Sequence, residues 1–329
     1  MIYIPFNENT RGIGGPSTFM INLKGYLLKV GYPFIDDQKN YKNADGIFFP
    51  ISFNRRILNF FKKNNLPIIQ RLDGVYYPSK HGIKYIYLNW EIKKDYLKYS
   101  DFVVFQSKYS RTECFTMLGE IDKNKYRIIY NGTDKNVFFP VNKDFDKSKI
   151  IFAATGSFRN KDMIEPVVLA LDLLKERYDI EFRVIGPILN EEVRDFTKRP
   201  YIKCLGEINK SEISRQLQKT DILIHCQLNP ACPNSVIEAI SCGIPVVGFD
   251  TGSMKEILYF CPELLAYVSK DVFQKYMDFN HERLLDKIIL CIENYQKFKR
   301  KFLEYNYLYD FKETYKEYIK IFKMVFKKQ

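Results

Sequence analysis

Residues 229–247 form a segment suited to ligand binding, since a helix-like pattern opens directly after an apolar run. Pro233 suits the first turn of a helix, where its missing N–H needs no partner. Asn234 and Ser235 can cap this helix, and the N–H groups of its first turn can hold an anion. Glu238 lies one turn further along the same edge and can accept hydrogen bonds from the vicinal hydroxyls of a sugar. The alternative is a capped helix with an exposed glutamate and no ligand.

Two further loops have residues suited to phosphate binding. Residues 11–17 include three glycines and stand between the first predicted strand and the first predicted helix. Glycines let the backbone approach a phosphate, and the dipole of the following helix favours negative charge there. Residues 156–161 form the analogous loop in the second half, with Arg159 and Lys161 as cations. Taken alone, each of these charges is a solvated surface group.

These loops are positioned by alternating strands and helices. The apolar runs are continuous, which predicts strands buried on both faces of a parallel sheet. We predict strands at 47–49, 67–69, 102–105, 128–129, 150–152, 182–185, 221–224 and 245–247. Helical spacing occurs at 16–29, 53–64, 85–99, 108–118, 163–178, 211–219 and 235–242. The alternation is typical of a doubly wound α/β fold.

The pattern restarts near the middle of the chain. Turn residues at 131–134 and a polar stretch at 139–149 precede a fresh apolar run at 150. We therefore predict a Rossmann-like domain at 1–145 and a second at 146–304. Two such halves are expected to face a cleft at the C-terminal ends of their strands. The end of the chain looks helical, and we expect the helix at about 305–329 to pack back on the first domain.

Composition excludes several classes of protein. Hydrophobic residues make up 46% of the 329 residues, enough for a core, and no run of about 18 uncharged apolar residues is present. Met1 to Phe6 resemble a strand rather than a signal peptide, so we expect a cytoplasmic protein. The seven cysteines form no C-x-x-C pair, and we expect buried reduced thiols. With only three histidines, we expect no metal site.

The net charge of +12 is concentrated in the first half of the chain. Residues 1–150 hold 24 Lys and Arg against 14 Asp and Glu. A basic surface attracts anionic lipid, nucleic acid or an acidic substrate. The chain has no recognisable nucleic-acid motif, so we do not expect nucleic acid as a partner. The alternative is an ordinary solvated surface.

The sequence resembles the GT-B nucleotide-sugar glycosyltransferases of glycosyltransferase family 4. The resemblance covers most of residues 1–260, and its most specific part is residues 232–247. The other matching segments are 14–19, 100–107, 128–134 with 138–140, 184–187 and 204–208. It implies the GT-B fold, two Rossmann-like domains facing a cleft, and a reaction that retains the anomeric configuration.

The resemblance also implies roles for individual residues. Glu238 matches the second Glu of an E-x7-E element that binds the ribose of the donor. Lys161 matches the lysine that steadies the donor diphosphate. The other matched donor-binding positions are Gly14 and Gly15 on the diphosphate, Asn234, Ser235 and Val236 at phosphate and sugar, and Ile208 beside the base. The resemblance leaves the choice between UDP- and GDP-linked donors open, and we expect no cofactor.

Three positions depart from the family pattern. The first Glu of E-x7-E falls at Pro230, and that carboxylate usually contacts the transferred sugar. The family's arginine falls at Ser157, where Arg159 is a substitute two residues later. No histidine stands near the acceptor where many members have one, so Asp73 in the segment 71–74 is the candidate for orienting the acceptor. A turn-forming Asp before Gly is the alternative for Asp73.

We expect sugar transfer from a nucleoside diphosphate to a hydroxyl of a glycan or lipid-linked acceptor. Lys161 and the amides of the two loops would stabilise the leaving diphosphate, without a metal. Residues 55–63 combine basic and bulky apolar residues, so peripheral contact with an anionic membrane is one hypothesis. An ordinary core helix is the other. Two alternative functions remain: another GT-B enzyme such as a nucleotide-sugar epimerase, and a catalytically weak or silent nucleotide-sugar or glycan-binding protein.

Overall fold

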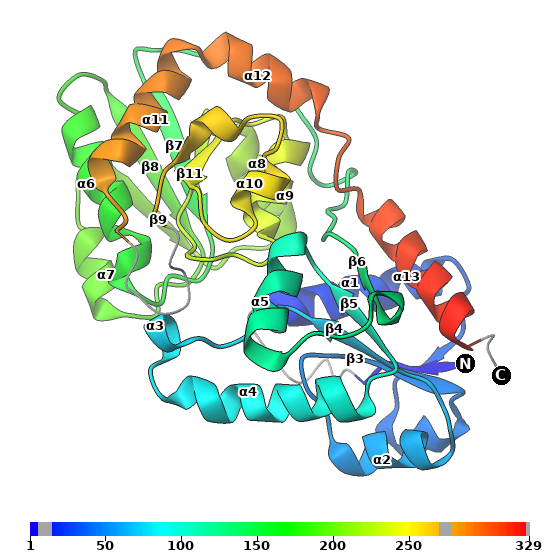
Figure 1. Ribbon diagram of the computed structural model, residues 1–329. Coiled ribbons are helices and arrows are strands. Elements are labelled where there is room, and N and C mark those ends of the chain that lie inside the picture. Colours follow the sequence, from blue (N-terminus) through cyan, green and yellow to red (C-terminus); the bar gives the residue numbers. More distant parts are fainter. Residues whose placement is uncertain (6–14, 270–277, 327–329) are drawn as a thin grey trace. The chain divides into compact units, whose positions relative to one another are not determined.

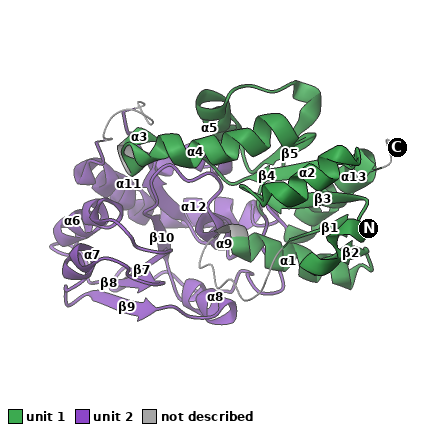
Figure 2. Ribbon diagram, turned by 90° about the horizontal axis from the view of Figure 1, so that it is seen from below, with its two compact units in different colours: residues 1–131, 273–275, 311–329 green, residues 132–272, 276–310 purple. Residues whose placement is uncertain are grey.

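The computed structural model describes residues 1–5, 15–269 and 278–326. These residues form two compact units (Figure 2). Unit 1 contains residues 1–131 together with the C-terminal helix from Phe311, and unit 2 contains the described residues of 132–310. Each unit has a parallel sheet with helices around it, which confirms the predicted α/β fold class.

The sequence placed the domain boundary at 145/146, whereas the compact units divide between Asn131 and Gly132. Residues that follow Gly132 form hydrogen bonds with the rest of unit 2. The amine of Lys135 donates to the carbonyl of Leu308 at 2.7 Å, and the hydroxyl of Ser214 donates to the carbonyl of Val137 at 2.6 Å. These contacts join a stretch without strand or helix signals to unit 2.

Unit 1 has a six-stranded sheet within the described residues, in the order β2-β1-β3-β4-β5-β6, with every pair parallel. The strands are β1 Ile2–Tyr3, β2 Phe34–Ile35, β3 Gly46–Pro50, β4 Ile68–Leu72, β5 Phe102–Phe105 and β6 Tyr126–Ile128. The α-helices are α1 Gly15–Lys29, α2 Arg55–Lys63, α3 Pro78–His81, α4 Lys84–Lys94, α5 Lys108–Leu118 and α13 Phe311–Phe326. The shorter helical turns are η1 Gln38–Asn43, the π-helical turn η2 Asp95–Tyr99 and η3 Lys123–Lys125.

Helices cover both faces of the unit 1 sheet, because successive strand residues point to opposite faces. Phe48 of β3 packs with side chains of α1 and α13, while its neighbours Ile47 and Phe49 pack with α2. Each such aromatic or aliphatic side chain contributes roughly 1.5–3 kcal/mol when fully buried. Tyr318 and Phe322 of α13 are fully buried beside α1 (Figure 1), so the last helix completes the core of unit 1.

Unit 2 has a second sheet of six parallel strands among the described residues, in the order β12-β11-β10-β7-β8-β9. The strands are β7 Ile150–Thr155, β8 Ile180–Ile185, β9 Ile202–Gly206, β10 Ile222–His225, β11 Val246–Phe249 and β12 Leu265–Ala266. The α-helices are α6 Glu165–Leu174, α7 Glu191–Phe196, α8 Lys210–Gln218, α9 Asn234–Ser241, α10 Met254–Ile257, α11 His281–Glu293 and α12 Tyr295–Glu304. The short turns are η4 Lys161–Met163 and η5 Pro262–Leu264.

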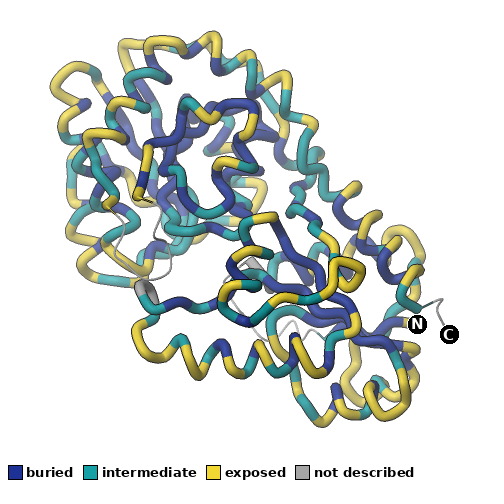
Figure 3. Tube along the Cα trace, in the orientation of Figure 1, coloured by how far each residue is buried: buried dark blue, intermediate teal, exposed yellow. Residues whose placement is uncertain are grey.

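The inner strands of both sheets are among the most deeply buried segments, as the dark blue parts of Figure 3 show, whereas the edge strands β2, β6 and β9 are only partly buried. The long apolar runs were located correctly from the sequence, because continuous burial leaves a continuous apolar signal. The first strand β1 was expected within residues 1–6, whereas the two-residue edge strands β2 and β12 were not predicted, since so few residues leave no pattern. The edge strand β9 was also missed, because only Ile202 of its five residues is buried. All seven cysteines are free thiols, and Cys204 is exposed, contrary to the expectation that all are buried.

Candidate functional site

In unit 2, β7 is the strand at which the order of the sheet reverses. The chain continues from β7 to β8 and β9 on one side, and β10 then pairs with the other edge of β7. Ligands of open parallel sheets bind outside the carboxyl ends of the strands at such a switch point. The predicted site residues of unit 2 follow β7, β9 and β10 at this end. They are the catalytic candidates Arg159 and Lys161 and the donor-binding candidates Ser157, Ile208, Asn234, Ser235, Val236 and Glu238.

The loop after β7 is fixed by the loop after β8. The amide of Phe158 donates to the carbonyl of Pro187 at 2.9 Å, and the amide of Leu189 donates to the carbonyl of Phe158 at 2.9 Å. Gly186 has a φ of +121°, and a Cβ added there would stand 3.0 Å from the carbonyl carbon of Gly156 and closer still to its oxygen. Only glycine fits this approach, so the two loops form one rigid support.

Two cations extend beyond this support. Phe158 is buried, Ser157 is half-buried, and Arg159 and Lys161 are exposed. Lys161 begins the turn η4, which leads into α6. Within the described part of the chain, neither Arg159 nor Lys161 forms an ion pair. Both charges are therefore available to an anion at the carboxyl edge of the sheet.

The start of α9 lies on the other side of the switch point. The sequence predicted Asn234 and Ser235 as caps, but Pro233 occupies the cap position and no side chain caps the helix. First-turn amides have no acceptor within their own helix, and the helix dipole adds partial positive charge. The side chain of Val236 is buried, so this residue can serve a ligand only through its backbone. The arrangement suits a phosphate group.

His225 was missed by the sequence analysis. It ends β10, it is buried, and its Nδ1 lies 3.3 Å from the hydroxyl of Ser235. Burial lowers the pKa of His225 to about 3, so the ring is neutral. Its Nε2 is buried with no hydrogen-bond partner among the described residues. The neutral ring thus positions Ser235 at the start of α9.

Glu238 lies one turn into α9 and is half-buried. Burial of its carboxyl raises the pKa to about 7, and the positive charge of Lys210 partly opposes this rise. Lys210 begins α8 and was also missed, because it is distant from Glu238 in sequence. A carboxyl with a pKa near neutrality can accept hydrogen bonds from ribose hydroxyls once it is ionised.

Pro230 occupies the place of the family's first carboxylate, and it is buried. Its carbonyl accepts a hydrogen bond from the amide of Ser253 at 2.8 Å. Gly252 has a φ of +58°, and a Cβ added there would stand 2.5 Å from the backbone N and O of Pro230. The hydroxyl of Thr251 also donates to the side-chain oxygen of Asn229. The loops after β10 and β11 are therefore closely packed, and position 230 provides no charge.

The candidate residues of unit 1 are placed differently. Gly14 lies outside the described residues, and Gly15 begins α1. Asp73 follows β4 and forms an ion pair with Arg71, whose side chain is fully buried. Burial raises the pKa of Asp73, and the guanidinium of Arg71 opposes that rise. Asp73 is therefore one half of a buried charge pair.

The partners of Arg71 come from distant parts of unit 1. Its Nε donates to the hydroxyl of Tyr318 at 3.1 Å and its Nη2 donates to the side-chain oxygen of Asn131 at 2.9 Å. The guanidinium carbon also lies 3.7 Å from the centre of the Phe19 ring. The side-chain amide of Asn131 in turn donates to Gln106 at 2.9 Å. Asn131, which the sequence analysis placed in a turn at 131–134, thus belongs to this buried network.

Within the described ranges, no group of three or more His, Cys, Asp or Glu side chains could hold a metal ion. Asp144 and Asp146 have the spacing of an acidic pair, but they precede β7 and so lie toward the opposite edge of the sheet. Asp146 accepts a hydrogen bond from the amide of Ser148 at 2.8 Å. Among the described helices, none is long and apolar enough to span a bilayer.

The fold is that of the GT-B glycosyltransferases. Sucrose-phosphate synthase from Thermosynechococcus elongatus is 12% identical, with a TM-score of 0.76 over 100% of this chain and 99% of that one. HepE from Anabaena, solved with UDP-glucose, is 15% identical with a TM-score of 0.70, over 98% and 99%. WaaG, a glycosyltransferase involved in lipopolysaccharide biosynthesis, is 10% identical with a TM-score of 0.70, over 98% and 99%. No curated protein sequence matches the chain.

Residues 148–263 match the family model described as "Glycosyl transferases group 1". This range contains every candidate residue of unit 2, from Ser157 to Glu238. The matched domain and the fold together support a glycosyltransferase of the GT-B type.

Proposed function

We propose that this protein transfers a hexosyl group from a nucleoside diphosphate to a hydroxyl of a glycan or lipid-linked acceptor, with retention of configuration and without a metal. One observation carries the proposal. At the switch point of the unit 2 sheet, two cations that form no ion pair with any described residue follow β7, and an uncapped helix start follows β10. Glu238, with a pKa near neutrality, lies one turn inside that helix.

In this proposal the donor is held by its diphosphate, its ribose and its base. Lys161 and Arg159 face the diphosphate together with the first-turn amides of α9. Glu238 accepts hydrogen bonds from the ribose hydroxyls, and Ile208, half-buried between β9 and α8, lies beside the base. The matching domain at residues 148–263 supports this arrangement. The role implied for Gly14 and Gly15 at the diphosphate stays a prediction.

The reaction breaks the bond between the anomeric carbon and the diphosphate oxygen. Positive charge develops on the sugar and negative charge on the leaving diphosphate, so preorganised cations and amide dipoles stabilise the transition state. Loss of one such donor typically costs ~10²–10³ in rate. In a front-face route the incoming hydroxyl oxygen bonds to the anomeric carbon on the face from which the diphosphate departs, which accounts for retention. The leaving phosphate accepts the proton of that hydroxyl. The cations supply the positive charge that a metal would otherwise provide.

The ligands of the similar structures support a nucleotide sugar as the donor and the hydroxyl of a glycan as the acceptor. HepE was solved with UDP-glucose, and TarM of S. aureus was solved with UDP, fondaparinux and alpha-GlcNAc-glycerol. By likeness, we propose a UDP-linked hexose as the first donor to test and a glycan or lipid-linked hydroxyl as acceptor. A cytoplasmic location accords with the use of a nucleotide-activated sugar.

The proposal is tested by donor binding and turnover. Thermal denaturation of the full chain with UDP, GDP and their glucose or mannose esters should reveal one ligand that raises the melting temperature. Lys161→Ala should then lower the rate of donor turnover by about 100-fold, while Lys219→Ala, at the exposed lysine that follows α8, leaves it unchanged. Equal rates in the two variants would remove Lys161 from the catalytic machinery.

A second function is favoured by Pro230 and Ser157, which replace charged residues of the family pattern. A protein that binds a nucleotide sugar without consuming it would show the thermal shift but release no nucleoside diphosphate with any acceptor. A nucleotide-sugar epimerase would convert the donor without an acceptor. Chromatography of the donor after incubation separates these outcomes from sugar transfer.

A further inference from the structure

Helix α4 and the turn η2 present large apolar side chains to solvent. Five of them form what we name the α4 face: Ile83 (82% exposed), Ile86 (56%), Tyr87 (67%), Trp90 (52%) and Leu97 (49%). No other helix among the described residues presents more than two exposed side chains of this size. Scattered apolar residues are normal on a protein surface, whereas a contiguous group marks an interaction site.

The α4 face follows from helical spacing. Residues 83, 86, 87 and 90 recur at intervals of three and four, so they lie along one side of the helix, and Leu97 follows in η2. Asn89 and Ile92, on the opposite side, are buried. One side of the helix therefore packs into unit 1, whereas the other side exposes apolar side chains to solvent.

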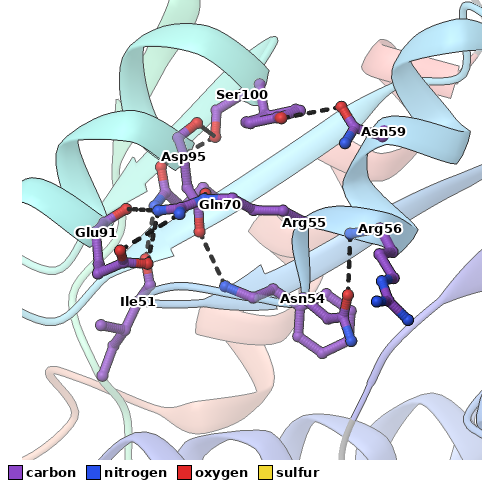
Figure 4. Close-up of polar contacts among 11 residues, drawn as sticks. Ile51, Asn54, Arg55, Arg56, Asn59, Gln70, Glu91, Asp95 and Ser100 are labelled. Carbon is purple, nitrogen blue, oxygen red and sulfur yellow. Dashed lines mark hydrogen bonds and ion pairs between the residues drawn. The ribbon is translucent and has the colours of Figure 1, made fainter.

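The inner side of α4 is firmly held, so the exposure of its outer side is not a result of loose packing. Arg55 forms ion pairs with Glu91 at 2.6 Å and with Asp95 at 3.4 Å. Asp95 also accepts a hydrogen bond from the amide of Phe53 at 3.0 Å (Figure 4). The side chain of Asn89 bonds both to the amide of Tyr76, at 2.9 Å, and to its carbonyl, at 2.6 Å.

The charges around the α4 face are positive. Lys84, Lys93 and Lys98 are exposed and flank the apolar residues on both sides. The amine of Lys94 lies 5.2 Å from the centre of the Trp90 ring. The two carboxylates of this region, Glu91 and Asp95, are already paired with Arg55. The surface therefore combines an aromatic and aliphatic centre with a cationic border, in the part of the chain where most of the net positive charge lies.

We propose that the α4 face docks this protein onto an anionic lipid surface. Trp and Tyr prefer the boundary between headgroups and acyl chains, where an amphipathic ring has both environments. Lysines beside an interfacial helix bind anionic headgroups. Ile83, Ile86 and Leu97 supply the apolar area that enters the boundary. This inference does not depend on the proposed sugar transfer.

The proposal moves the membrane contact away from the segment that the sequence suggested. Residues 55–63 form α2, and its apolar residues Ile57, Leu58 and Phe61 are buried in the core of unit 1. The exposed positions of α2 are polar or charged, among them Arg56, Lys62 and Lys63. Such a helix has charge but no free apolar face, whereas α4 has both.

Trp90 is the only tryptophan of the chain, which provides a direct measurement. The full-length protein is titrated with vesicles of phosphatidylcholine alone or mixed with phosphatidylglycerol. With the anionic vesicles, Trp90 fluorescence should shift to shorter wavelength and be quenched by brominated acyl chains. Co-sedimentation should increase in parallel and fall at high salt. Binding to anionic vesicles without any change in Trp90 emission would show that a different surface docks, and would overturn the proposal.

Matched variants separate the apolar and charged contributions. Tyr87→Ser with Ile83→Ser should lower vesicle binding about tenfold, because it removes apolar area from the boundary. The control, Leu28→Ser with Tyr259→Ser, removes exposed apolar residues elsewhere and should bind like the wild type. Lys84→Gln, Lys93→Gln and Lys98→Gln together should abolish the salt dependence, unlike the control set Lys29→Gln, Lys147→Gln and Lys219→Gln. Equal loss in test and control variants would contradict the assignment.

Two further measurements control for misfolding and for self-association. The variants should keep the wild-type melting temperature and the nucleotide-induced thermal shift, which shows that the fold and the donor site are intact. Sedimentation velocity should show no self-association that the α4-face variants abolish. If the face instead joins two copies of the chain, such association would appear without lipid and the membrane proposal would be wrong.

Discussion

The hydroxyl of Ser235 lies 3.3 Å from Nδ1 of His225, so a buried neutral histidine at the end of β10 contacts the first turn of α9. This pair links the strand at the switch point to the helix start that we propose binds phosphate. His225 has no hydrogen-bond partner for Nε2 within the described residues, which leaves Ser235 as its polar contact in the structure. The ring therefore acts as a positioning residue.

Replacement of His225 by Phe or of Ser235 by Ala should weaken nucleotide-sugar binding by a similar factor. One net hydrogen bond contributes ~0.5–1.5 kcal/mol, which corresponds to about 2- to 12-fold in affinity. Because the two residues act through one contact, the double variant should bind no more weakly than either single variant. Titration calorimetry measures all four proteins. Fully additive losses would show that the two side chains act independently.

The raised pKa of Glu238 predicts a pH-dependent affinity. Its pKa is about 7 in the folded protein without ligand, and the ionised form is the better acceptor for ribose hydroxyls. Affinity for a nucleotide sugar should therefore rise between pH 6 and pH 8, with release of a proton on binding. A nucleotide sugar is preferred to a free diphosphate, because its phosphates do not titrate in this range. The variant Glu238→Gln should bind more weakly and show a flat profile.

The same group affects stability with the opposite dependence on pH. Glu238 binds its proton more tightly in the folded state than in the unfolded state, where its pKa is about 4.5. The stabilisation of the folded state by this tighter proton binding is therefore fully present below about pH 4.5 and is lost as the pH rises to about 7. Glu238→Gln should be more stable than the wild type above pH 7 in urea unfolding. If Glu238→Gln were less stable than the wild type at pH 8, the predicted desolvation of the Glu238 carboxylate would be wrong.

Gly186 should be essential to the loop that supports Lys161. Gly186→Ala places a Cβ against the backbone of Gly156 and should lower the free energy of unfolding by more than ~1 kcal/mol, with weaker donor binding. Gly206→Ala is the matched control. Gly206 also has a positive φ, of +66°, but a Cβ there meets nothing within 4 Å. Gly206→Ala should lower the free energy of unfolding by only about 1 kcal/mol, because it strains the backbone without a steric clash. If the two variants lost equal stability, the close approach of Gly186 to Gly156 would be unimportant.

Asp73 should affect stability more strongly than a surface residue would. Asp73→Ala leaves the buried guanidinium of Arg71 without its carboxylate, and loss of one member of a buried pair costs about 3–5 kcal/mol. Urea unfolding should show this loss without any ligand. A control at an exposed acid, Asp122→Ala, should cost much less. An unchanged stability for Asp73→Ala would return this residue to the role of a solvent-accessible acceptor-orienting group.

The sequence could nominate candidate site residues in unit 2 because their signals are local. Lys161 and Glu238 each stand at a fixed distance from an apolar run, and parallel strands bring such positions to one edge of a sheet. His225 and Lys210 have no local signal, since each matters through one side chain that folding brings near it. The cap of α9 was predicted wrongly for a related reason. Ser235 has the chemistry of a cap, but a buried histidine competes for its hydroxyl.

The two helices of unit 1 with basic and apolar residues also show that the sequence does not reveal which side chains are buried by tertiary packing. Residues 55–63 and 85–99 both have amphipathic spacing, and nothing in the sequence says which apolar face meets the core. Only the packed structure shows that Ile57, Leu58 and Phe61 of α2 are buried while Ile86, Tyr87 and Trp90 of α4 are exposed.

The amino-acid sequence by itself determined the alternation of strands and helices, the parallel α/β class, the loop after β7 that leads to Lys161 and the helix that carries Glu238. These follow from periodicity and turn residues, which act over a few neighbouring positions. The tertiary structure alone decided the pairing of Arg71 with Asp73, the raised pKa of Glu238, the contact of His225 with Ser235 and the exposure of Trp90. Burial, charge environment and hydrogen-bond partners depend on atoms from distant segments, and the chain brings those atoms together only when it folds.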